Sequence, residues 1–164
     1  MPKYLHCALA LATAAGVTLA ASAPLAAADD TAAATYQEIE EMLGSVPKLF
    51  KVFPEVGIAG AWAEFKSVQL NPDTALDGKT KELLGLAVSA QIPCEYCIYF
   101  HTAAAKANGA TEEEIKEAIA MAAIVRHWST VLNGSQVDEV AFRKEVDDLM
   151  QRAADMAATG STAE

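Results

Sequence analysis

Basic residues are scarce in this chain of 164 residues, which has 12 Lys and Arg against 22 Asp and Glu and a formal net charge of −10. Binding to nucleic acids or to anionic membrane surfaces depends on clustered Lys and Arg, which neutralise phosphate groups. We therefore expect neither nucleic acid nor a membrane among the partners of the folded protein. The length is that of one domain, since about 100–200 residues per domain is usual.

The sequence also lacks the alternating, β-branched runs that are typical of strands. Apolar residues recur instead at helical spacing, between Pro, Gly and Asn residues that end helices. We expect an all-α fold with one domain over residues 36–156, and flexible segments over 29–35 and 157–164. The predicted helices cover residues 36–43, 47–52, 54–70, 78–90, 94–108, 111–132 and 136–156, and the first and sixth start with capping boxes at Thr35 and Thr111.

Charge is almost absent from the first 28 residues, where Lys3 is the lone base and residues 5–28 contain no Asp, Glu, Lys or Arg. This layout is typical of a secretory signal peptide. The small residues that end in Ala28 predict cleavage before Asp29, and hence a periplasmic or secreted protein. The alternative is an uncleaved anchor helix, for which a run rich in Ala and Thr is weakly hydrophobic.

Cysteine is rare: the chain has three, and Cys7 lies in the predicted signal peptide. Cleavage therefore leaves one CxxC pair, Cys94 and Cys97, in an oxidising compartment. Such a short loop constrains the unfolded chain little, so stabilisation is a weak reason for the pair. We expect a redox-active disulfide with no further cofactor and no metal. A non-catalytic module with a structural disulfide, or with zinc on both thiols, His101 and Glu82, stays open as an alternative.

Three residues of the CxxC region fall on one face of a predicted helix: Cys94, which opens it, Cys97 and His101. Backbone N–H groups at a helix N-terminus stabilise a thiolate, and a His one turn after Cys97 can accept its proton. Glu82, on the preceding helix, can orient the imidazole if the two helices pack as a hairpin. The helix terminus favours Cys94 as the thiolate and His101 favours Cys97, so the residues alone leave the order open.

The spacing of Glu82, eleven residues, Cys94, two residues, Cys97, three residues and His101 resembles the alkylhydroperoxidase D-like branch of the carboxymuconolactone decarboxylase superfamily. Two earlier segments, residues 46–50 and 76–83, are also similar to that branch. The resemblance covers roughly residues 36–132. The composite spacing is specific, whereas a CxxC motif alone would be a weak signal.

The resemblance implies an all-helical thiol peroxidase, a homo-oligomer such as a trimer, dimer or hexamer, that reduces hydroperoxides at the expense of an unidentified thiol reductant. It assigns Cys97 as the peroxidatic thiol, Cys94 as the resolving thiol, and His101 with Glu82 as the proton relay. Attack of the Cys97 thiolate on a peroxide would give a sulfenic acid, which Cys94 would convert to a disulfide. The runner-up within this class is a dithiol-disulfide exchange carrier.

Two features depart from the family pattern. Tyr96 occupies a position where the best-known members carry a second His, and a phenol is a poor base at neutral pH. An exported protein would also need an electron source other than the cytosolic partners that are familiar in the family. His127, on the following helix, is a further candidate, since it could line the mouth of the site.

Overall fold

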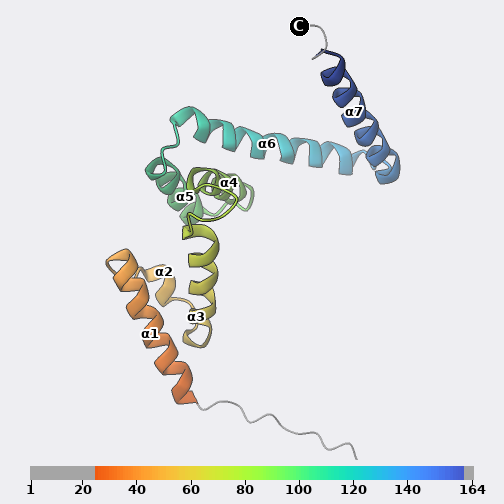
Figure 1. Ribbon diagram of the computed structural model, residues 1–164. Helices are drawn as coiled ribbons and strands as arrows, with labels where there is room; N and C mark the ends of the chain where they lie inside the picture. The colour runs from red at the N-terminus through yellow and green to blue at the C-terminus, as the bar shows by residue number, and fades with distance from the viewer. Residues whose placement is uncertain (1–24, 161–164) are drawn as a thin grey trace, which may run out of the picture. The chain divides into compact units, whose positions relative to one another are not determined.

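The computed structural model describes residues 25–160 and confirms the all-α fold, with no strand in that range. Pro47 and Pro54 stand directly before helices, where a missing N–H is harmless. No helix in this range is both long enough and apolar enough to cross a bilayer. The elements are α1 (Leu25–Leu43), α2 (Lys48–Lys51), α3 (Glu55–Glu64), the π-helix η1 (Phe65–Leu70), α4 (Gly78–Gln91), α5 (Glu95–Ala107), α6 (Glu112–Gly134) and α7 (Glu139–Gly160). Figure 1 labels the seven α-helices.

The helices predicted as one domain fall into two compact units, which divide between Phe65 and Lys66. In the first unit, α1 packs against α3, and α2 also contacts α3. The core is apolar and aromatic, with Ile39, Phe50, Ile58 and Trp62 all buried. The Phe50 and Trp62 rings meet edge to face with centroids 5.3 Å apart. These two aromatics are therefore ordinary core residues.

The first helix begins earlier than the sequence predicted. Residues 25–34 continue α1 upstream, so Thr35 lies inside the helix and donates its hydroxyl to the Thr31 carbonyl at 2.8 Å. The predicted capping box at Thr35 is therefore wrong. Two effects stabilise this extension of the helix. Ala has a high helix propensity, and the Ala32 side chain packs in the core. The predicted flexible segment 29–35 and the bond between Ala28 and Asp29 lie within α1, whereas residues 1–24 of the predicted signal peptide lie outside the described residues.

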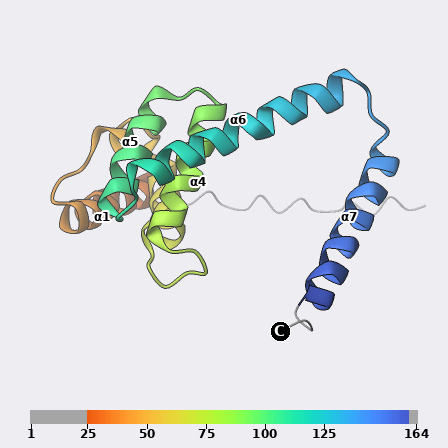
Figure 2. The ribbon, with the colours of Figure 1, turned by 90° about the horizontal axis from the view of Figure 1, so that it is seen from above.

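In the second unit, α4 packs against both α5 and α6, as Figure 2 shows. Each of these helices has a side-chain cap at its N-terminus. Asp77 accepts from the Thr80 N–H at 2.7 Å, and Cys94 caps α5. Thr111 and Glu114 form the predicted capping box at the start of α6. The predicted stop after α5 is confirmed as well, since Gly109 has a φ of +84° that favours glycine.

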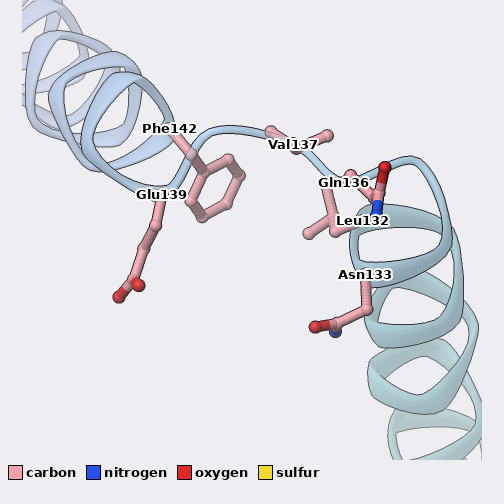
Figure 3. Close-up of a pocket in the computed structure, with 6 residues that line it drawn as sticks. All are labelled: Leu132, Asn133, Gln136, Val137, Glu139 and Phe142. Atoms are coloured by element: carbon pink, nitrogen blue, oxygen red, sulfur yellow. The ribbon is translucent and has the colours of Figure 1, made fainter.

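The end of α6 departs from the prediction. Gly134 is still helical, and Gln136 takes the left-handed conformation, with a φ of +51°. A hollow of about 280 Å³ lies at this junction with α7 and holds none of the predicted site residues (Figure 3). Three apolar residues of the last helix, Val140, Leu149 and Met150, are exposed in the single chain. The α7 helix runs to Gly160, four residues beyond the predicted end, and residues 161–164 are outside the described range.

Candidate active site

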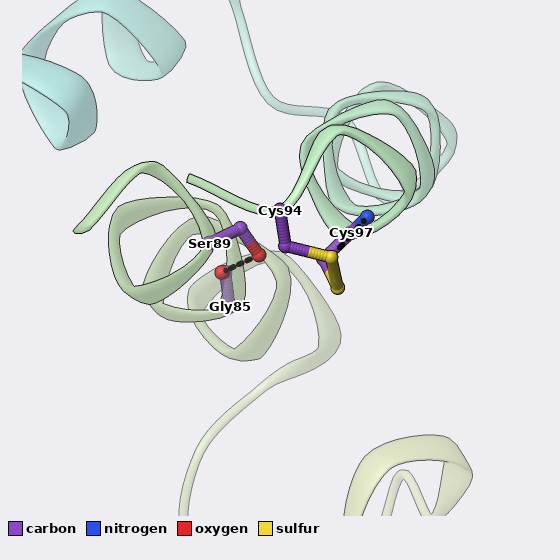
Figure 4. Close-up of a disulfide and its surroundings, with 4 residues drawn as sticks. All are labelled: Gly85, Ser89, Cys94 and Cys97. Atoms are coloured by element: carbon purple, nitrogen blue, oxygen red, sulfur yellow. Dashed lines mark hydrogen bonds between the residues drawn. A yellow bond between two sulfur atoms is a disulfide. The ribbon is translucent and has the colours of Figure 1, made fainter. Parts of the chain in front are cut away.

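The two cysteines lie at the N-terminus of α5, where the predicted helix opens. Cys94 is the N-cap residue, and its sulfur accepts from the Cys97 N–H at 3.3 Å. Figure 4 shows the disulfide that joins the pair. The two Cα atoms lie 5.3 Å apart. Both residues are half-buried. A backbone N–H that points at a sulfur favours negative charge there, so this helix end supports a thiolate when the pair is reduced.

The predicted helix hairpin brings Glu82 and His101 together. His101 Nδ1 lies 2.7 Å from Glu82 Oε2, between α5 and α4. The Glu82 side chain is 6% exposed and the His101 side chain 20%. A buried carboxylate at this distance accepts a hydrogen bond from the Nδ1–H of the imidazole, which leaves Nε2 to exchange protons. His101 follows Cys97 by four residues in α5, so the imidazole and the sulfur share a face of that helix.

Gly85 holds the imidazole in a way that the sequence did not reveal. A Cβ atom built at position 85 would clash with Cε1 and Nδ1 of His101. The ring therefore lies directly on the backbone of α4, one turn after Glu82. A glycine inside a helix lowers stability. Its presence within a predicted helix is therefore the sequence signal that could have marked this position.

Gln69 is a second residue that sequence reasoning missed. Its Nε2 donates to Glu82 Oε1 at 3.1 Å, on the oxygen that His101 does not use. Gln69 belongs to the π-helix η1, and such irregular turns occur often at functional sites. The sequence carries no local signal for this contact, because thirteen residues separate the partners.

Ser89 connects the two halves of the site through α4. Its hydroxyl donates to the Gly85 carbonyl at 2.6 Å (Figure 4). Its own carbonyl accepts from the Cys94 N–H at 3.1 Å. The side chain is buried, so both contacts are shielded from water. The last turns of α4 thus carry the backbone on which His101 lies and also fix the residue that opens α5.

The two remaining candidates lie on exposed surface. Tyr96 is 89% exposed, and its side chain points away from the core of the unit. His127 is exposed on α6, where its ring meets the ring of Trp128 edge to face. Within the described residues, no hydrogen bond or ion pair joins either one to Glu82 or His101. Of the six predicted residues, the structure thus joins four in two pairs, Cys94 with Cys97 and Glu82 with His101.

The metal site that the sequence left open as an alternative would need several His, Cys, Asp or Glu side chains as ligands. Between residues 25 and 160, no three His, Cys, Asp or Glu side chains form a group that could hold a metal ion. Glu82 instead has both oxygens engaged by nitrogen donors of His101 and Gln69. The arrangement is suited to moving a proton beside a pair of thiols.

Comparisons with known proteins relate this chain to one family. The model of the carboxymuconolactone decarboxylase family matches residues 57–139, which include the whole constellation. A protein of Paracoccus denitrificans described as uncharacterized protein 4 in the cox locus is 38% identical over 107 residues, which are 63% of this chain and 95% of that protein. The crystal structure of an alkylhydroperoxidase AhpD core from Rhodospirillum rubrum superposes with a TM-score of 0.60 at 28% identity, over 69% of this chain and 86% of that one. The protein thus belongs to the carboxymuconolactone decarboxylase family and to its alkylhydroperoxidase D-like branch.

Proposed function

We propose that this protein is an exported thiol peroxidase that reduces hydroperoxides through a dithiol–disulfide cycle of Cys94 and Cys97. The observation that carries the proposal is the 2.7 Å contact between His101 and the buried Glu82, one helical turn after Cys97. A structural disulfide has no need of an imidazole held in this way. A proton relay next to a thiol does need one, since the thiolate is the nucleophile.

The proposed reaction balances with one peroxide and two thiols. His101 accepts the proton of Cys97, and the thiolate attacks the terminal peroxide oxygen. The O–O bond breaks, the sulfur becomes a sulfenic acid, and the alkoxide takes the proton from His101 to leave as an alcohol. Cys94 then attacks the sulfenic sulfur, and water leaves as the disulfide forms. A thiol or dithiol donor must return two electrons and two protons to restart the cycle.

Two wider parts of the proposal concern location and assembly. The composition of the first 28 residues supports export, which requires that the reducing thiol also act outside the cytosol. Self-association is supported by apolar side chains that are exposed on the later helices, including Trp128 on α6 and Met150 on α7. Such surface is usually covered in a soluble protein, and a second copy of the chain is the commonest cover.

Disulfide exchange with another protein is a second candidate. Tyr96 and Tyr99 are 89% and 81% exposed on the same short helix as the cysteines. Exposed tyrosines beside a disulfide offer a partner protein an apolar surface and a hydrogen-bond donor. In this case the same dithiol would pass electrons between proteins, and peroxide would react with it slowly.

The two candidates are separated by the rate of thiol oxidation. The reduced protein is mixed with excess cumene hydroperoxide, and the loss of free thiols is followed by mass spectrometry in wild type, Cys97→Ser and Cys94→Ser. The peroxidase predicts fast loss in wild type, and a sulfenic acid that can be trapped on Cys97 when Cys94 is absent. A sulfenic acid trapped on Cys94 instead would exchange the roles of the two cysteines. This outcome needs to be tested because the Cys97 N–H donates to the Cys94 sulfur, which favours a thiolate there. Loss no faster than that of a free thiol would favour disulfide exchange.

A further inference from the structure

Each oxygen of the Glu82 carboxylate has a hydrogen-bond partner, and only one of these partners, His101, belongs to the proposed relay. Oε2 contacts His101 Nδ1 at 2.7 Å, and Oε1 accepts from Gln69 Nε2 at 3.1 Å. We infer that Gln69 is a positioning residue: it fixes the plane of the Glu82 carboxylate and so keeps His101 in the tautomer that leaves Nε2 free as the base. This role in catalysis rests on the proposed function, whereas the effect on the tautomer does not.

The amide of Gln69 is suited to this role because it cannot gain or lose a proton near neutral pH. A carboxylate with one strong partner can still rotate about its last torsion angle, which is broad for such sp² groups. A second donor on the other oxygen removes that freedom. Since Glu82 is buried, an oxygen left without a donor would also carry a desolvation cost, which favours the doubly held geometry.

The backbone around Gln69 is itself tied to α4. Lys81 Nζ donates to the Asn71 carbonyl at 2.7 Å, just after the end of η1. Lys81 and Glu82 are neighbours in α4. Both are thus hydrogen-bonded to residues 69–71 at the end of η1. The π-helical turn adds a residue relative to an α-helix and sets the direction of the side chains at its end. Gln69 lies in that turn, so its reach to Glu82 depends on this local backbone.

The consequence for His101 concerns which nitrogen carries the proton. In a neutral imidazole the hydrogen bond of one nitrogen decides where the proton sits. A fixed Glu82 carboxylate keeps the proton on Nδ1. Histidine that is free in water favours the proton on Nε2, and that form has no lone pair at Nε2 to accept a thiol proton. Loss of Gln69 should therefore shift the tautomer of His101 and slow the proton transfer without changing how peroxide meets the protein.

The test is a nitrogen-15 NMR measurement of the His101 tautomer in the full chain, at a pH where the imidazole is neutral. The chain has three histidines, so the spectrum of His101→Gln assigns the signals. The wild type should be mainly the Nδ1–H form, and in Gln69→Leu the Nε2–H form should become the major one. The matched control is Gln37→Leu, which removes an amide that donates to Glu41 at 2.9 Å on exposed surface. That control should leave the His101 signals unchanged.

Kinetics provide a second measurement. Gln69→Leu should lower kcat for the hydroperoxide roughly tenfold, the kind of loss that follows when an outer partner of a reactive group is removed. KM should stay unchanged because Gln69 touches the carboxylate and not the substrate. If Gln69→Leu does not fold, Gln69→Met removes the donor with a side chain of similar length, and circular dichroism verifies the fold.

An unchanged His101 tautomer in both folded variants would overturn the inference, whatever the peroxidase activity. A shifted tautomer in a protein whose wild type does not reduce peroxide would support the positioning role and count against the proposed function. The two failures are therefore distinguishable. A fall of kcat with an unchanged tautomer would also overturn the inference, since the loss would then have another cause.

Discussion

The two units each contain a carboxylate that links two helices, but the partners differ in kind. In the first unit Glu38 Oε2 accepts from the indole Nε1 of Trp62 at 3.0 Å. In the second unit Glu82 accepts from the imidazole of His101. The indole nitrogen is a hydrogen-bond donor only, whereas an imidazole can both accept and release a proton. One contact therefore joins helices, and the other can also move a proton.

The surroundings of the two carboxylates reinforce the difference. Trp62 is 1% exposed in a cluster of aromatic and aliphatic side chains, where it contributes mainly to packing. The second unit buries a carboxylate, Glu82, and a hydroxyl, that of Ser89, whose carbonyl accepts from the Cys94 N–H. A protein that buries a carboxylate must supply donors for it, and the second unit supplies two of them. A buried acid with a titratable partner is a stronger sign of chemistry than burial alone.

The largest effect is expected when the same substitution is made in both units. Glu82→Gln removes the charge that stabilises a protonated His101 and should slow thiol oxidation by cumene hydroperoxide about 100-fold or more. Glu38→Gln makes the identical change on a carboxylate whose partner is an indole, and the rate should not change. Stopped-flow measurement of thiol loss in the two reduced variants gives both numbers.

An equal fall in the two variants would show that the effect is one of folding and would remove the functional distinction between the carboxylates. Urea unfolding of each variant provides the necessary control. Glu38→Gln should still form its hydrogen bond to Trp62 through the amide oxygen, so its stability should change little.

Helical glycines offer a second matched pair, with a smaller effect. Gly85→Ala puts a methyl group where the ring atoms of His101 lie, so the imidazole must move and the oxidation rate should fall about tenfold to 100-fold. A Cβ atom at Gly60 in α3 would lie in open space. Gly60→Ala should therefore raise the free energy of unfolding by about 0.5–1 kcal/mol. Rates and urea unfolding curves of both variants test the pair, and an undiminished rate in Gly85→Ala would contradict the placement of the ring.

The smallest expected effect is a loss of stability at acid pH, which arises from two carboxyl groups of the second unit. Lys79 Nζ lies 2.7 Å from Glu114 Oε1 and, with the N–H of Thr111, holds the pKa of Glu114 below its ordinary value of 4.5. A carboxyl group whose pKa is lowered by folding stabilises the fold above the ordinary value, and this contribution is lost as the pH falls through the lowered one. Asp77 at the cap of α4 behaves alike, because its pKa is lowered from 3.8 by the Thr80 N–H.

The melting temperature should therefore decrease slightly as the pH is lowered past 4.5, and Glu114→Gln should flatten part of that decrease. Glu113→Gln is the matched control, since this exposed neighbour has only a 3.8 Å ion pair with Lys116. Thermal unfolding followed by circular dichroism over the acid range makes the comparison. Identical pH profiles for the two variants would show that the Lys79 contact does not contribute.

Sequence patterns predicted the local parts of the second unit well. The Thr111 capping box and the stop at Gly109 are confirmed, because both depend on residues within a few positions of each other. The predicted start of α1 was wrong because it, too, was inferred from neighbouring residues alone. Thr35 followed by Glu38 has the form of a capping box, but the pattern cannot reveal that Ala32 packs into the core and extends the helix upstream.

The sequence by itself determined that the chain is helical, that Cys94 opens a helix, and that Cys97 and His101 share one face of it, since helical geometry relates residues four positions apart. It also offered Glu82 as a partner for His101. Only the tertiary structure decided that the carboxylate reaches the imidazole, that the ring lies on Gly85 and that Gln69 takes the second oxygen. These contacts join separate helices, and their distances are set by packing, which no local pattern of residues encodes.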